Sequence, residues 1–232
     1  GSFEAMRRRV EEKREEGFRC IKLKIGAIDF ESELALVRMV REKFGKDAVI
    51  RLDANGAFEE EEAMYKLERL SAFGIHSVEQ PVRAGNYAAM RRIAANAPVA
   101  VALDEELTGL YDETSKREML AYIRPACIVL KPSLVGGFYG TEQWIRIAES
   151  MGIAWWITSA LESNIGLNAI AQWTYIHGNP LPQGLGTGAL FTNNTDTPLY
   201  TEGGYLRYAV GKRPSRCDVE ALFRERYGNG GL

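Results

Sequence analysis

Short apolar runs recur along the chain about every 25 residues, and a helix-like stretch or a loop separates each run from the next. In the first run, apolar and basic residues alternate, so Lys22 and Lys24 are expected side by side on one face of a strand. Seven runs have this strand character, at residues 20–25, 48–54, 76–80, 99–105, 127–133, 154–160 and 183–188.

Between these runs, apolar residues recur at helical spacing. The stripes comprise Leu34, Val37, Val40 and Phe44, then Met64, Leu67 and Leu70, then Trp144, Ile147, Ala148 and Met151. Residues 3–16 also predict a helix, which ends at Gly17. Strands alternating with helices indicate repeated βα units around a parallel sheet. The repeat length, and the absence of G-x-G-x-x-G after the first run, favour a (β/α)8 barrel over a doubly wound sheet.

The predicted fold is therefore α/β, a TIM-like (β/α)7β barrel that lacks its first strand. A helix opens the chain where a strand should come first, so the polypeptide is expected to be incomplete. Residues 1–190 are expected to form strands two to eight of the barrel, and the turn-rich residues 191–232 an appendage with a last short charged helix.

Composition narrows the range of partners. The 232 residues are 46% hydrophobic, which suits one large domain, and the net charge is −2 with no long basic run. We therefore expect no nucleic acid and no membrane as partner. No segment approaches the roughly 18 apolar residues of a membrane helix, so a cytoplasmic location is expected. Three cysteines without a C-x-x-C pair argue against disulfides and a cysteine metal site.

Polar residues end several of the apolar runs. In a barrel of this kind the active site lies at the carboxyl ends of the strands. Each such residue has an ordinary explanation: Asp53 a turn, Glu79 a strand end and Asp104 a helix cap. Together, however, three carboxylates in one barrel mouth would repel one another and need a cation. Mg²⁺, which prefers oxygen ligands, fits this requirement, and Mn²⁺ is an alternative.

The lysines complete the predicted site. An ammonium group close to another ammonium and to a divalent cation loses protonation free energy, so one of Lys22 and Lys24 could serve as a base. Lys131 would approach from across the barrel. It would act as a second acid/base or as a fixed positive charge. The expected partner is a small-molecule carboxylate, whereas the sequence does not indicate an oligomeric state.

Seven motifs in order carry a family resemblance from about residue 3 to residue 208. They are "KLK", "LDANGAF", "VEQP", "ALDEE", "LKPS" followed by "GG", "SALESNIG" and "GLGTGALFTNN". Their order and spacing resemble the enolase superfamily, specifically its muconate lactonizing subgroup, and most closely its o-succinylbenzoate synthases. A lysine base working with Mg²⁺ is a known property of this superfamily.

The resemblance implies a role for each residue. It makes Asp53, Glu79 and Asp104 the Mg²⁺ ligands, with Asn55 behind them. Lys24 would take the proton alpha to the carboxylate and then assist loss of the hydroxyl. Lys22 would orient the carboxylate and depress the pKa of Lys24, while Lys131 would stabilise the enediolate. Ser159 and Glu162 are candidates for substrate contact.

The implied reaction is the dehydration that forms o-succinylbenzoate in menaquinone biosynthesis. The resemblance also implies an N-terminal α+β capping domain, which this sequence is expected to lack together with the first strand. Residues 191–232 are expected to pack back toward the side of the barrel that faces the capping domain. Alternatives are an N-acylamino acid racemase, a dipeptide epimerase, a Schiff-base aldolase using Lys131, and an inactive barrel fragment. Neither His76 nor His177 is placed as the seventh-strand base of the mandelate racemase subgroup, and the Asp-x-Asp of dipeptide epimerases is missing.

Overall fold

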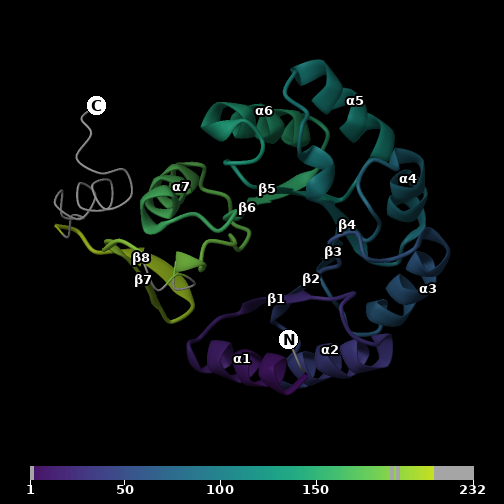
Figure 1. The fold of residues 1–232 in the computed structure, drawn as a ribbon, viewed down its shortest axis with the longest axis horizontal. Coiled ribbons are helices and arrows are strands. Elements are labelled where there is room, and N and C mark those ends of the chain that lie inside the picture. The colour runs from purple at the N-terminus through teal and green to yellow at the C-terminus, as the bar shows by residue number, and fades with distance from the viewer. Residues whose placement is uncertain (1–2, 189–190, 192–193, 212–232) are drawn as a thin grey trace, which may run out of the picture.

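Six parallel strands form one curved sheet and neighbour one another in chain order (Figure 1). The computed structural model of the protein describes residues 3–188, 191 and 194–211. The strands are β1 Cys20–Lys24, β2 Val49–Asp53, β3 Ser77–Glu79, β4 Ala100–Leu103, β5 Cys127–Leu130 and β6 Ala154–Ile157. Each lies within one of the first six apolar runs, so these six strand predictions are confirmed.

Helices connect the strands and cover the outer face of the sheet (Figure 1). They are α1 Phe3–Glu15, α2 Phe30–Phe44, α3 Glu60–Ser71, α4 Tyr87–Asn96, α5 Glu113–Ile123, α6 Gly137–Ser150 and α7 Asn164–Ile176, with a short 3-10 helix η1 Glu105–Leu107. Parallel strands need such crossovers. Among the described helices, side-chain caps begin α2, α4 and α5, and a capping box begins α3; at α2, for example, Asp29 accepts a hydrogen bond of 2.9 Å from the Ser32 amide.

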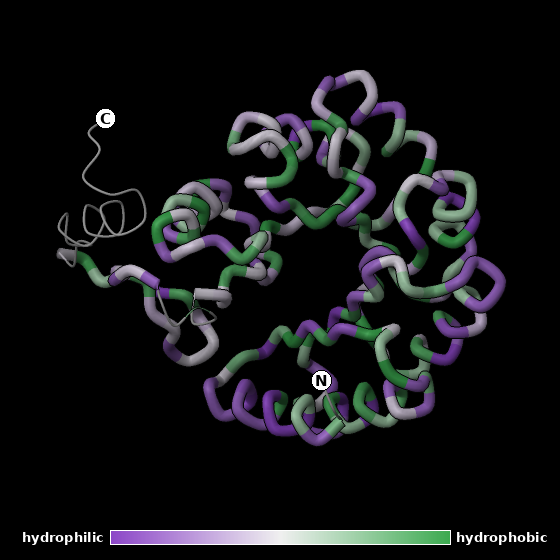
Figure 2. Tube along the Cα trace, viewed as in Figure 1, coloured by the Kyte–Doolittle hydropathy of each residue, from purple (hydrophilic) through white to green (hydrophobic). Residues whose placement is uncertain are grey.

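Apolar side chains fill both faces of the sheet in two separate clusters. The larger cluster joins the helices to the strands and contains the predicted stripe residues Val37 and Leu67, both fully buried. In Figure 2, hydrophobic positions accordingly gather along the strands and hydrophilic ones along the outer turns of the helices. The smaller cluster lies on the opposite face and consists of Ala102, Cys127, Val129 and Trp156, with Ala154 and Leu181 against it.

A buried arginine completes the packing of this inner face. The guanidinium of Arg51 lies 3.8 Å from the ring centre of Trp156, a cation–π contact. Its Nη1 donates a hydrogen bond of 2.8 Å to the carbonyl oxygen of Pro182. Arg51 therefore ties β2 to the segment that follows α7, across the inner face of the sheet.

The seventh predicted strand, at residues 183–188, is seen only in part. Only a single parallel bridge forms there, between Thr158 and Gly184, with the Gly184 amide 2.7 Å from the carbonyl oxygen of Ile157. The segment is rich in glycine, which has no side chain to pack and weakens a strand. Gly184 also approaches Thr158 so closely that a Cβ there would lie 2.5 Å from the threonine hydroxyl. The described residues thus form a parallel, half-barrel sheet, and a closed barrel is not seen among them.

A hairpin follows the sheet and consists of β7 Leu199–Glu202 and β8 Tyr205–Tyr208. It lies between α7 and α1 in Figure 1. Its turn lies against the connection between α1 and β1, so closely that a Cβ on Gly204 would clash with the carbonyl oxygen of Gly17. The predicted terminal charged helix and Cys217 lie outside the described residues. The division at residue 190 stays a prediction.

One arginine clamps the amino-terminal side of the sheet. Arg41, in the last turn of α2, donates hydrogen bonds of 2.7 to 3.2 Å to the carbonyl oxygens of Gly45, Lys46, Ala48, Phe73 and Gly74. We expect Arg41→Ala to lower the free energy of unfolding by about 2 kcal/mol, because these carbonyl groups lose a charged donor. Urea denaturation would measure this. Arg38→Ala, an exposed position one turn earlier, should cost much less; equal losses would contradict the clamp.

Candidate active site

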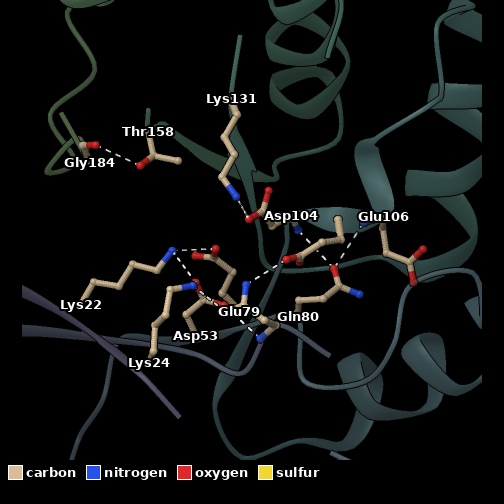
Figure 3. Close-up of polar contacts among 12 residues, drawn as sticks. Lys22, Lys24, Asp53, Glu79, Gln80, Asp104, Glu106, Lys131, Thr158 and Gly184 are labelled. Carbon is tan, nitrogen blue, oxygen red and sulfur yellow. Dashed lines mark hydrogen bonds and ion pairs between the residues drawn. The ribbon is translucent and has the colours of Figure 1, made fainter. Parts of the chain in front are cut away.

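The predicted lysines and carboxylates meet at the carboxyl ends of the strands (Figure 3). Strand register places Lys24 beside Asp53 and Asp53 beside Glu79. The Lys22 ammonium lies between two carboxylates, 2.8 Å from Asp53 Oδ2 and 2.7 Å from Glu79 Oε1. Both carboxylates are almost completely buried, with side chains 2% and 1% exposed. Lys22 therefore bridges the ends of β2 and β3.

Lys24 reaches the same carboxylate from the rim. Its ammonium lies 3.2 Å from Asp53 Oδ2 and 2.5 Å from Asn55 Oδ1, and its side chain is 70% exposed. Asn55 also donates through its side-chain amide to Glu105 Oε1 at 2.9 Å. The left-handed backbone of Asn55, with φ of 45°, lets its amide donate to Asp53 Oδ1. Lys24 is thus held by neighbours yet accessible to a molecule from solvent.

Lys131 enters from the opposite side of the group. Its ammonium makes an ion pair with Asp104 Oδ2 (Figure 3). The Lys131 side chain is 19% exposed and that of Asp104 is 5% exposed. Each of the three predicted metal ligands consequently faces at least one lysine ammonium.

Burial and charge shape the protonation of this group. Burial, together with the charges of Asp53 and Asp104, raises the pKa of Glu79 to about 8, although Lys22 opposes the shift. Burial alone would lower the pKa of Lys22, but the attraction of Glu79 and Asp53 raises it. For Asp53, burial is outweighed by Lys22 and Lys24, so its pKa is lowered. Burial therefore makes the negative charge of Glu79 costly even beside Lys22.

The donor set fits a hard divalent cation. Glu79 Oε2 is buried and has no hydrogen-bond partner, so one carboxylate oxygen is left for a ligand. The three carboxylates offer oxygen donors of the kind that Mg²⁺ prefers. With the side chains as they stand, no three acidic, histidine or cysteine residues of the described chain are grouped closely enough to hold a metal ion. Lysine ammonium groups supply positive charge there instead: Lys22 lies between Asp53 and Glu79, and Lys131 lies beside Asp104.

The two candidates for substrate contact lie together but apart from this group. Glu162 Oε1 accepts a hydrogen bond of 2.6 Å from the Ser133 hydroxyl, and Ser159 Oγ accepts one of 2.9 Å from the Leu161 amide. Burial raises the pKa of Glu162, but hydrogen bonds from Ser133 and Ser159 lower it overall. Among the described residues, neither Ser159 nor Glu162 has a hydrogen bond or ion pair with the three carboxylates.

Three polar residues next to the site were not predicted from the sequence. Gln80, Glu105 and Glu106 directly follow predicted ligands in "VEQP" and "ALDEE", where only Glu79 and Asp104 were selected. Glu106 is 4% exposed and accepts a hydrogen bond of 2.9 Å from the Gly85 amide. A strand-end carboxylate followed by further polar residues could have indicated them.

Both histidines lie in aromatic surroundings away from the carboxylates. The rings of His76 and Trp156 meet edge to face at 5.9 Å, and those of His177 and Trp173 at 4.4 Å. No helix among the described residues is long and apolar enough to cross a membrane.

The family follows from comparison with known proteins. A family model described as enolase C-terminal domain-like matches residues 5–214. The chain belongs to this family. The expected superfamily resemblance is thereby confirmed.

Individual members of the family are also similar to this chain. It is 52% identical over 207 residues to the o-succinylbenzoate synthase of Desulfotalea psychrophila, covering 89% of this chain and 56% of that enzyme. The crystal structure of MenC from Desulfotalea psychrophila LSv54 matches with a TM-score of 0.82 and 51% identity, covering 89% of this chain and 57% of that one. The chloromuconate cycloisomerase of Pseudomonas putida is 34% identical over 148 residues, which are 64% of this chain and 39% of that enzyme. The chain thus spans about half the length of the relatives it matches.

Proposed function

We propose that this chain forms the catalytic half of a Mg²⁺-dependent lyase of the o-succinylbenzoate synthase type. The observation that carries the proposal is the meeting of Lys22 and Lys24 with the buried carboxylates of Asp53 and Glu79. The 52% identity to an o-succinylbenzoate synthase supports the choice of substrate. The enzyme would act on a small carboxylate in menaquinone biosynthesis, in the cytoplasm.

Asp53, Glu79 and Asp104 would hold the metal, which would supply positive charge to the substrate carboxylate and to the negative charge that develops on it. Mn²⁺ could replace Mg²⁺ in this site. The buried, unpartnered oxygen of Glu79 supports this assignment. Asn55 would hold Lys24 in place, as its contacts with Lys24 and Glu105 suggest.

Lys24 would take the proton alpha to the substrate carboxylate, leaving the electron pair delocalised as an enediolate. It would then return a proton to the departing hydroxyl, which leaves as water while the ring becomes aromatic. Lys22 would orient the carboxylate, and Lys131 would place a fixed positive charge opposite Lys24. Ser159 and Glu162 would contact the remainder of the substrate.

The six strands would be part of a (β/α)7β barrel whose first strand lies outside this chain. Residues 1–190 would supply strands two to eight, with the glycine-rich segment at 183–188 paired fully only in the complete barrel. Residues 191–232 would pack toward the capping domain. The single bridge between Thr158 and Gly184 supports the direction of this last pairing.

Racemisation of an N-acylamino acid, or epimerisation of a dipeptide, is the second candidate reaction. It would use Lys24 and Lys131 on opposite faces of the alpha carbon. A Schiff base on Lys131 is less well supported, since its ammonium is paired with Asp104. Exchange of the alpha proton with deuterated solvent, without loss of water, would favour racemisation or epimerisation over dehydration.

The test is a dehydratase assay with Mg²⁺, on this chain alone and with the unaligned part of the Desulfotalea psychrophila enzyme supplied in trans. We expect aromatic product to form with Mg²⁺ and to disappear with EDTA, then return when Mn²⁺ is added. An activity that survives the chelator would contradict the proposal. Activity only in trans would mean that the chain alone is an inactive fragment.

A further inference from the structure

Gln80 follows Glu79 and has an unusual backbone conformation. Its φ is 41°, in the left-handed region that residues other than glycine rarely adopt. The residue is completely buried, with 0% of its surface exposed. A polar side chain in this conformation and this environment needs compensating interactions.

The backbone of Gln80 bonds to both neighbouring strand ends. Its amide donates a hydrogen bond of 2.9 Å to the carbonyl oxygen of Ala102, on β4. Its carbonyl oxygen accepts one of 2.7 Å from the Gly56 amide, in the turn that follows β2. Gln80 thereby links the turn after Asp53, the end of β3 and the strand before Asp104.

The side chain of Gln80 uses both ends of its amide. Oε1 accepts long hydrogen bonds from the backbone amides of Asp104 and Glu106, at 3.3 and 3.4 Å. Nε2 donates to the carbonyl oxygen of Val82 at 3.0 Å. Figure 3 shows this side chain between the carboxylate group and Glu106.

We propose that Gln80 is a positioning residue that sets the spacing of the three metal-binding carboxylates, an inference that rests on the proposed function. Its hydrogen bonds reach the chain segments that carry Asp53, Glu79 and Asp104. This role requires a side chain with both a hydrogen-bond donor and an acceptor, and long enough to reach Val82, Asp104 and Glu106. Glutamate would lose the donor to Val82, and asparagine would be one methylene too short to reach Asp104 and Glu106.

The experiment compares Gln80→Asn with Gln183→Asn. Asparagine tolerates the left-handed region, so Gln80→Asn keeps the backbone conformation of position 80. Its side chain is one methylene shorter and cannot reach the amides of Asp104 and Glu106. Gln183 is a matched control because its side chain also joins backbone groups: Oε1 accepts from the Ile157 amide at 2.7 Å and Nε2 donates to the Leu181 carbonyl oxygen at 2.6 Å. Within the part of the chain that the structure describes, its side chain makes no hydrogen bond with the three carboxylates.

Two quantities are measured on the 232-residue chain. Titration with Mn²⁺ alone, followed by electron paramagnetic resonance, should give a Kd about 10 to 100 times weaker for Gln80→Asn, and one unchanged within about twofold for Gln183→Asn. Amide hydrogen exchange without metal should be faster at Asp104 and Glu106 in Gln80→Asn only. The exchange measurement does not depend on activity.

Equal Mn²⁺ affinity in the wild type and Gln80→Asn would overturn the role of Gln80. A wild type that binds no Mn²⁺ would overturn the proposed metal site, whereas faster exchange in Gln80→Asn would still support the positioning of Asp104. If Gln80→Asn does not fold, Gln80→Met replaces it. If neither variant folds, wild-type exchange decides: slow amides at Asp104 and Glu106 support the inference, and amides as fast as those of an exposed loop overturn it.

Discussion

Lys24→Ala is expected to lower the turnover number for dehydration by about 10²- to 10⁴-fold, the contribution of a positioned acid/base group. Its ammonium is the more exposed of the two on β1 and is held by Asp53 and Asn55, so a bound substrate can reach it. Lys22 is occupied by Asp53 and Glu79. Metal affinity should remain, because the carboxylates are unchanged. Steady-state kinetics with the complementing segment, and a Mn²⁺ titration, would measure both.

The control for this experiment is Lys46→Ala, which removes an exposed lysine from the turn between α2 and β2. It should leave the turnover number unchanged. If Lys24→Ala retained a tenth or more of the activity, the base would have to be another lysine, and Lys131 would be the next to test. Retention of solvent exchange at the alpha carbon in Lys24→Ala would identify such a base directly.

Glu79→Gln should stabilise the metal-free protein at high pH and abolish metal binding. The pKa of Glu79 is raised to about 8 by burial and by Asp53 and Asp104. Between the ordinary carboxyl pKa and that value, the folded protein binds a proton that the unfolded chain does not. The free energy of unfolding therefore falls as the pH rises through this window, by an amount on the order of a few kcal/mol. Glutamine cannot ionise, so the variant should escape this loss.

Urea denaturation in EDTA at pH 5 and pH 9 would test this expectation. The wild type should lose stability between the two values, and Glu79→Gln should lose less. His76 has the opposite effect on the pH dependence of stability: burial and Arg51 lower its pKa, so the free energy of unfolding rises with pH. This contribution is the same in wild type and Glu79→Gln. The control is Glu68→Gln, at an exposed position of α3, which should follow the wild type. Identical pH dependence in wild type and Glu79→Gln would contradict the expected protonation.

The sequence by itself determined where most strands lie and which side chains share a face. Six apolar runs became strands: β2 to β6 are buried on both faces, which requires nearly continuous apolar residues with few polar exceptions, whereas β1 alternates buried apolar residues with exposed lysines. Those exceptions fall at strand ends, and the two-residue period of a strand places Lys22 and Lys24 on one face. Parallel strands all present their carboxyl ends at one edge. Thus the gathering of lysines with Asp53 and Glu79 could be predicted from local patterns alone.

Only the tertiary structure decided how distant segments pair. It assigned Lys22 to both Asp53 and Glu79, and Lys131 to Asp104. It also made Gln80 a link between strand ends and reduced the pairing of residues 183–188 to a single bridge. These outcomes depend on the distances between segments far apart in the chain. Local periodicity carries no information about such distances, because they are set by the curvature of the sheet and by the packing of helices against it.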